Sequence, residues 1–440
     1  MNKRLLTAVL LLRLIPLPAQ EIHSLGRCLE TGLENNFSLI IARNREAVSA
    51  NNYTRGNAGY LPSVDVSGRA GGTVTGTRQV MTDGTENTSS GVHNMNAGAG
   101  LNLGWTLFDG FSVQTTYRKL GELQQAGMLN TRMAVENLMA GIASTYYNYI
   151  QQIQLYRNLQ VALDLSRERV RIDDERYLLG SGSRLQLLQS KVYFNSDSSR
   201  LARQSEVVRN LQVRLNELMA VENLSGRIVP ADSAIRVRED LSFEVLLEQT
   251  LAKNTGLLIA SANLALSEYD RKLIASQTYP YLNFSGGYTY GWNAYGSSQV
   301  DWQTSGSVNY GLTLGMNLFD GLNQQRREKN ALIEVENREL EYQEVMQSVK
   351  ADLITVYNGY TNNLRLLKLE EENLKTAAEN LEIALERYKL GNLSGLELRE
   401  VQLSLLDAEE RLLSVQYQAK LAEISLLQIT GRMEEYLETE

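Results

Sequence analysis

Residues 95–110 read MNAGAGLNLGWTLFDG, and the same pattern returns at residues 308–321 as VNYGLTLGMNLFDG. In both stretches apolar side chains tend to occupy every second position, with glycine, asparagine or threonine between them. A period of two residues with one apolar face is typical of a β-strand. Each stretch ends in the tetrapeptide LFDG, and a long charged segment follows it. The sequence therefore predicts two equivalent strands, each with an abrupt change of structure at its end.

A similar alternation precedes each of these strands and completes a strand pair. It covers residues 64–70 and 282–292, shortly after Pro62 and Pro280. A β-sandwich with one buried face is one explanation. We favour a transmembrane β-barrel, because the polar positions carry small residues suited to a wet interior and the strands are long, with Trp and Tyr toward their ends. Four strands cannot close a barrel, since the smallest transmembrane barrels have eight, so several chains must share one.

The segment after each LFDG predicts a long helix. In the second copy the apolar positions follow alternating steps of four and three, as in a coiled-coil seam: Tyr342, Met346, Val349, Leu353, Val356 and Tyr360. The pattern runs over residues 322–389, which corresponds to about 100 Å of helix. Gly180 and Gly391 are expected to end the two long helices, and shorter helices return from residues 185 and 396.

LFDG lies where the period changes, so we expect it to be the strand-to-helix junction. Asp109 is expected to cap the first helical turn, and Gly110 to supply the backbone freedom for the change of direction. At the other end of the strand pairs, the polar segments 77–91 and 293–305 are expected to be extracellular loops.

The chain is a duplicated unit. The two copies correspond at an offset of 218 residues before the strands and of 211 residues from LFDG onward, without a gap over the predicted helices. A single inserted residue would rotate the rest of a helix by about 100°, so the constant offset supports continuous helix. We expect a signal peptide at residues 1–20, a first repeat at 21–219, a linker at 220–240 and a second repeat at 241–440. Within the repeats, the strand pairs are expected at 62–108 and 280–319, and the tip turns at 179–184 and 390–395.

Composition excludes several classes of function. The net charge of −8 and the absence of a basic stripe disfavour nucleic-acid binding. The two histidines, His23 and His93, lie in dissimilar settings, and no motif predicts a metal site, a cofactor or a catalytic constellation, so we do not expect an enzyme.

Lys3 and Arg4 before a short apolar run are typical of a secretory signal. Cys28, the single cysteine, is interpreted as a small apolar residue in a helix.

Taken together, the LENN opening at Leu33, the proline before each first strand, LFDG, the RYxxG hairpins and the tandem duplication resemble the TolC-like outer-membrane efflux proteins, the outer membrane factors. The resemblance covers nearly the whole chain after residue 20. It implies a mixed α and β membrane protein: a homotrimer whose 12-stranded transmembrane β-barrel, with four strands from each chain, continues as an α-helical coiled-coil tunnel through the periplasm. It also implies the outer membrane of a Gram-negative bacterium, with outer-membrane lipid, a periplasmic adaptor and an inner-membrane transporter as partners.

The resemblance further implies a periplasmic gate. In the family the closed tip is lined by acidic residues six and nine positions after the glycine of the second hairpin. Counting from Gly391 gives Glu397 and Glu400, which are glutamates where the best-known member has aspartates. Threefold symmetry would gather six carboxylates near one axis, where they would attract cations. The alternative is a solvated helix face, which is the usual meaning of two glutamates at this spacing.

Other tip residues follow from the same resemblance. The family tyrosine three residues before the glycine is present as Tyr388, and its usual acidic partner falls at Gln186, so a neutral hydrogen bond replaces a charged one. The family arginine two residues after the glycine falls at Leu393, so a salt bridge that helps to hold the tip closed in the family is absent here. The resemblance implies adaptor contacts at two tips: Leu179, Gly180, Ser181, Leu390, Gly391 and Asn392. Glycine capping of a helix would explain the glycines equally well.

We therefore predict a passive outer-membrane exit duct of a tripartite efflux or type I secretion system. The competing hypothesis is a soluble periplasmic coiled-coil or adaptor protein, which the four amphipathic strands disfavour. Drugs, metals and proteins all remain open as substrates.

Overall fold

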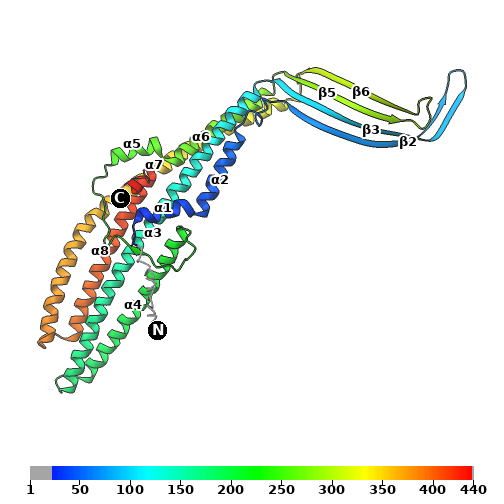
Figure 1. Ribbon diagram of the computed structural model, residues 1–440. Coiled ribbons are helices and arrows are strands. Elements are labelled where there is room, and N and C mark those ends of the chain that lie inside the picture. The colour runs from blue at the N-terminus through cyan, green and yellow to red at the C-terminus, as the bar shows by residue number, and fades with distance from the viewer. Residues whose placement is uncertain (1–21, 439–440) are drawn as a thin grey trace, which may run out of the picture. The chain divides into compact units, whose positions relative to one another are not determined.

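The structure is a computed structural model that describes residues 22–438 (Figure 1), so the predicted signal peptide at 1–20 lies outside the described residues. The chain divides into two compact units, and each takes segments from both predicted repeats. The helical unit comprises the described parts of Met1–Ala42, Arg132–Asn254 and Gln347–Glu440. The strand unit comprises Arg43–Thr131 and Thr255–Met346.

The strand unit contains one antiparallel sheet. Its strands lie side by side in the order β2 (Ser63–Val80), β3 (Glu86–Asp109), β5 (Tyr281–Ala294) and β6 (Trp302–Gly315). Residues paired across a sheet share a face. One such row joins Val66, Leu101, Tyr288 and Val308, and the next row joins Ser67, Gly100, Thr289 and Ser307. The predicted alternation is confirmed, and it gives the sheet one apolar and one polar face.

The hairpin between β2 and β3 is longer than the sequence predicted. Only residues 81–85 form the turn, so the expected loop at 77–91 is wrong for most of its length. Polar side chains pair across the ladder there: the Thr77 and Ser89 hydroxyls lie 2.7 Å apart, and Arg78 forms a 2.8 Å ion pair with Glu86. Because β5 ends opposite Met95, the hairpin continues beyond it as a two-stranded ribbon.

The first LFDG is the junction that the sequence predicted. β3 ends at Asp109, whose carboxylate oxygens accept hydrogen bonds of 3.1 and 3.2 Å from the amide of Val113, in the first turn of α3 (Ser112–Leu178). Gly110 and Gly321 have φ angles of +68° and +73°, in the left-handed region that glycine adopts at little cost. The expected cap and the expected role of Gly110 are confirmed.

The second junction differs from the first. β6 ends at Gly315 rather than at residue 319, because its partner there is Tyr281, the first residue of β5. β3 runs to the corresponding point because β5 pairs with it as far as Asp109. β6 has no described strand on its other side, so the residues of the second LFDG lack a ladder partner.

The long helices have equal lengths in the two halves of the chain. α3 and α7 (Asn323–Lys389) each contain 67 residues, and the returning helices α4 (Arg184–Leu218) and α8 (Gly395–Ile429) each contain 35. Shorter elements complete the chain: β1 (Ile22–His23), α1 (Leu25–Asn35), α2 (Phe37–Asn52), β4 (Val229–Pro230), α5 (Phe243–Lys253), α6 (Thr255–Ser276) and α9 (Glu435–Glu438). None of the helices in residues 22–438 is long and apolar enough to cross a membrane.

Two equivalent tyrosines attach the segment between the repeats to the helical core. Tyr149 on α3 and Tyr360 on α7 are both buried. Tyr149 donates a 3.0 Å hydrogen bond to the carbonyl of Ile228, and Tyr360 donates one to the carbonyl of Arg238. The predicted linker at 220–240 is therefore bound along the helices rather than loosely connected to them.

Cys28 lies fully buried in α1, as expected of a small apolar residue.

Candidate functional site

The two helical hairpin tips are built alike. Gly180 and Gly391 have φ angles of +74° and +79°. The amides that follow them bond back to the last helical turns: Ser181 to the carbonyl of Arg176 at 2.9 Å and Asn392 to the carbonyl of Arg387 at 2.8 Å. Each glycine thus ends its helix. The leucines just before them are among the most exposed apolar side chains of the helical unit, Leu179 at 82% and Leu390 at 76%.

Both returning helices begin with a capping box. In α4 the Ser183 hydroxyl accepts from the amide of Gln186 at 3.2 Å, and Gln186 Oε1 accepts from the amide of Ser183 at 3.0 Å. In α8, Ser394 and Glu397 form the same pair of bonds at 3.2 and 2.9 Å. Gln186 and Glu397 are therefore equivalent residues of the two copies, and each has a local structural role at the tip.

Glu397 and Glu400 are both exposed, in the first and second turns of α8. They are three residues apart and thus neighbours on the helix surface. Hydrogen bonds from the side chain and the backbone of Ser394 hold the pKa of Glu397 below its usual value. The Glu397 side chain therefore stays a carboxylate in mildly acidic solution.

Tyr388 has a different partner from the one that the sequence predicted. It is buried in a small cluster with Ala384 and Leu398, and its hydroxyl donates to the carboxylate of Asp173 on α3. The expected pairing with Gln186 is wrong because the Gln186 side chain caps α4, although both residues line the same cavity. Burial and the bond to Asp173 raise the pKa of Tyr388 to about 12, so the phenol remains a neutral donor.

A buried ion pair near the tips escaped the sequence reasoning. Arg399 on α8 makes two 2.7 Å bonds to the carboxylate of Asp197 on α4, and Ser166 on α3 donates to the same carboxylate. Both members of the pair are under 10% exposed. At the 211-residue offset the counterpart of Asp197 is Ala408 and that of Arg399 is Leu188, so the two halves of the chain differ at both positions. That joint difference is a signal in the sequence that could have indicated the pair.

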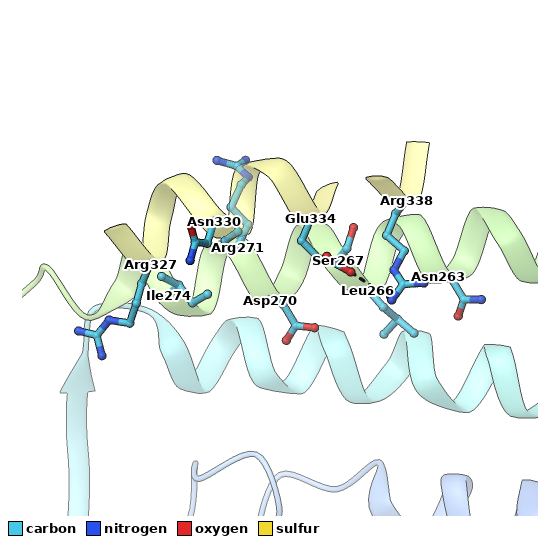
Figure 2. A pocket seen from close by; sticks show the side chains of 11 residues that line it. Asn263, Leu266, Ser267, Asp270, Arg271, Ile274, Arg327, Asn330, Glu334 and Arg338 are labelled. Carbon is cyan, nitrogen blue, oxygen red and sulfur yellow. Dashed lines mark ion pairs between the residues drawn. The ribbon is translucent and has the colours of Figure 1, made fainter. Parts of the chain in front are cut away.

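A second polar site is a cavity of about 620 Å³ in the strand unit, between α6 and α7 (Figure 2). Three arginines line it, but each is ion-paired: Arg271 with Glu268, Arg327 with Asp320 and Arg338 with Glu334. The paired charges make it a weaker candidate than the tips. Within residues 22–438, no cluster of histidine, cysteine, aspartate and glutamate has the arrangement of a metal site.

Comparisons with known proteins agree with the fold. The family described as "Outer membrane efflux protein" matches residues 29–221 and 246–432. Among curated relatives, the pyoverdine export outer membrane protein OpmQ of Pseudomonas aeruginosa is 22% identical over 354 residues, which cover 79% of this chain and 72% of that protein. Outer membrane protein TolC of Vibrio cholerae is 20% identical over 307 residues, covering 68% and 69% respectively.

Solved structures have the same fold. The outer membrane protein VceC of Vibrio cholerae superposes with a TM-score of 0.77 at 17% identity, over 92% of this chain and 96% of that one. The CmeC outer membrane channel of Campylobacter jejuni gives 0.76 at 17% identity, over 94% and 88%. The family resemblance is confirmed, and the competing hypothesis of a soluble adaptor loses its support. The chain belongs to the outer membrane efflux protein family, which makes it an outer-membrane protein of an efflux pathway.

Proposed function

We propose that three copies of this chain form a passive exit duct, in which a 12-stranded barrel crosses the outer membrane and the long helices line a periplasmic tunnel. One observation carries the proposal: the four-stranded sheet has an apolar and a polar face, and its outer strands β2 and β6 each pair on one side only. In a bilayer every backbone polar group needs a partner, so open strand edges must pair with another chain.

Barrel geometry requires more than one chain, and the family resemblance gives the number. The smallest closed transmembrane barrels have eight strands, which two chains of four would supply, and three chains give twelve. The family resemblance favours three. The apolar row through Val66, Leu101, Tyr288 and Val308 would then face lipid, and the row of small polar residues beside it would face the channel water.

We assign the hairpin tips to partner contact and to closure. The exposed Leu179 and Leu390 suit a docking surface for a periplasmic adaptor, together with the turn residues Gly180, Ser181, Gly391 and Asn392. The adaptor would connect the duct to an inner-membrane transporter, which supplies the energy.

Glu397 and Glu400 are proposed to line the narrowest point, where a threefold axis would gather six carboxylates and favour cations over anions. Tyr388 is proposed to hold α7 against α3 near this point, through Asp173. Gln186, which lines the same cavity, acts through the cap of α4.

Mass measurement of the detergent-solubilised protein tests the assembly, and single-channel recording in a planar bilayer tests the duct. We expect a mass of about three chains and ion conduction across the bilayer. A stable monomer that retains its full β-sheet signal in circular dichroism would overturn the proposal, because the four-stranded sheet would then be stable without pairing to another chain.

A further inference from the structure

Arg169, on α3 in the helical unit, is a buried cation whose hydrogen-bonding capacity is partly unused. Its side chain is 4% exposed, and neither Nε nor Nη1 has a hydrogen-bond partner among the described residues. The nearest carboxylate oxygen is Oδ2 of Asp173, which lies 4.0 Å from Nε, beyond hydrogen-bond distance. The other carboxylate oxygen of Asp173 accepts from Tyr388. A buried N–H group without an acceptor is costly, so an added acceptor for Nε or Nη1 would be favourable.

The surrounding residues fix the guanidinium in place. Cζ of Arg169 lies 4.9 Å from the centre of the Tyr193 ring, and Cζ of Arg399 lies 5.1 Å from the same centre. Arg399 already has its own carboxylate, Asp197, through two hydrogen bonds. Gly395, the first residue of α8, provides the space for Arg169, because a Cβ atom there would lie 2.9 Å from Nη2. A preorganised guanidinium loses less entropy when it binds an anion.

Arg169 lines a cavity of about 730 Å³ with an excess of positive charge. The lining includes Arg176 and Lys389 as further cations, and Asp173 is its only carboxylate. The cavity is also lined by Gly395 and Leu396, at the start of α8. The first amides of a helix have no carbonyl partner within it and carry partial positive charge, which attracts anions. The buried guanidinium, whose Nε and Nη1 lack hydrogen-bond acceptors, and the helix end therefore favour the same class of ligand.

We propose that this cavity binds a small oxyanion of the carboxylate or phosphate type, held by Arg169 and the backbone amides of Gly395 and Leu396 at the start of α8. A bound oxyanion would connect α3 to the start of α8 and stabilise the tip in this arrangement. The inference goes beyond the proposed duct and does not depend on it, because binding can be measured on the full-length protein in detergent without any conduction.

The experiment is calorimetric titration of the wild-type protein with sodium phosphate and, separately, with sodium acetate, against sodium chloride of equal ionic strength. We expect binding of at least one of the two oxyanions. Arg169→Gln should weaken it at least ten-fold, about 1.4 kcal/mol. Gly395→Ala should also weaken it, because the new Cβ displaces the guanidinium while the charge remains. Arg171→Gln is the matched control: it removes an exposed, ion-paired arginine two residues away and should leave the affinity within two-fold.

Three results would overturn the proposal. If neither oxyanion binds the wild-type protein more tightly than chloride does, the cavity is not an oxyanion site. If Arg169→Gln folds and binds as tightly as the wild type, the anion lies elsewhere. If Arg169→Gln does not fold, the Gly395→Ala variant decides, and unchanged affinity in that variant rejects the site.

Discussion

The buried pair of Asp197 and Arg399 leads to a prediction in which two substitutions are less harmful than one. Asp197→Ala removes the carboxylate that accepts two hydrogen bonds from Arg399, and it leaves the guanidinium buried without that partner. Breaking a buried ion pair in this way costs about 3–5 kcal/mol. Adding Arg399→Leu removes the stranded charge and gives both positions the residues of the other repeat, Ala408 and Leu188. Replacing both members of a buried pair by apolar residues is often neutral or stabilising.

The expected size of the effect can be converted to melting temperature. A chain of 440 residues has an unfolding entropy of about 0.9 kcal/mol/K, so Asp197→Ala should lower the melting temperature by about 3–5 °C. The double variant should recover at least half of that loss. Circular dichroism of the detergent-solubilised proteins, at one protein concentration and in one detergent, measures both values.

The matched control is Glu217→Ala, which breaks an exposed 2.7 Å pair with Arg214 on α4. Exposed pairs contribute about 0–1 kcal/mol, so the melting temperature should change by about 1 °C or less. The reasoning is refuted if the double variant melts as low as Asp197→Ala alone, because the loss would then come from lost packing and not from an uncompensated charge.

Four further outcomes are expected. Glu397→Ala combined with Glu400→Ala should abolish the cation preference in single-channel recordings; an unchanged reversal potential would make both residues ordinary surface charges. In a Glu400→Ala background, Ser394→Ala should move the loss of cation preference to higher pH, because the Ser394 bonds that lower the pKa of Glu397 are weakened and the carboxylate is neutralised earlier on acidification. Tyr388→Phe should cost about 1–3 kcal/mol by leaving Asp173 without its donor, and should raise conductance with little change in selectivity. Gly110→Ala should lower the melting temperature more than Gly321→Ala, although both positions have positive φ. A Cβ at Gly110 would lie 2.3 Å from the Ser276 carbonyl oxygen, whereas a Cβ at Gly321 would lie 3.7 Å from its nearest neighbour. Equal losses in melting temperature would contradict this prediction.

The sequence predicted the features that depend on local periodicity. The strands alternate because each has one apolar and one polar face, and the helices run without insertions because an added residue would rotate everything after it. The caps at Asp109 and at the tip glycines follow from short-range chemistry and were predicted by the same kind of reasoning.

The features that depend on packing between helices were not predictable in this way. Tyr388 and Asp173 are 215 residues apart, and their contact depends on how α3 lies against α7. Gln186, which the family resemblance assigned as the partner of Tyr388, uses its side chain to cap α4 instead. The length of the β2–β3 hairpin was missed because polar residues on both faces look like a loop, although they pair across the ladder.

That hairpin divides the strand unit into parts of unequal local stability. Beyond Met95 the ribbon of β2 and β3 has no third strand, and isolated two-stranded ribbons are marginally stable in water. Its amide protons are therefore the ones in the sheet that exchange first with solvent, and its turn at residues 81–85 is where a protease cuts most easily. A cut there leaves each new end on a strand that continues into the four-stranded part of the sheet, so the same turn is a suitable place for the termini of a circularly permuted chain.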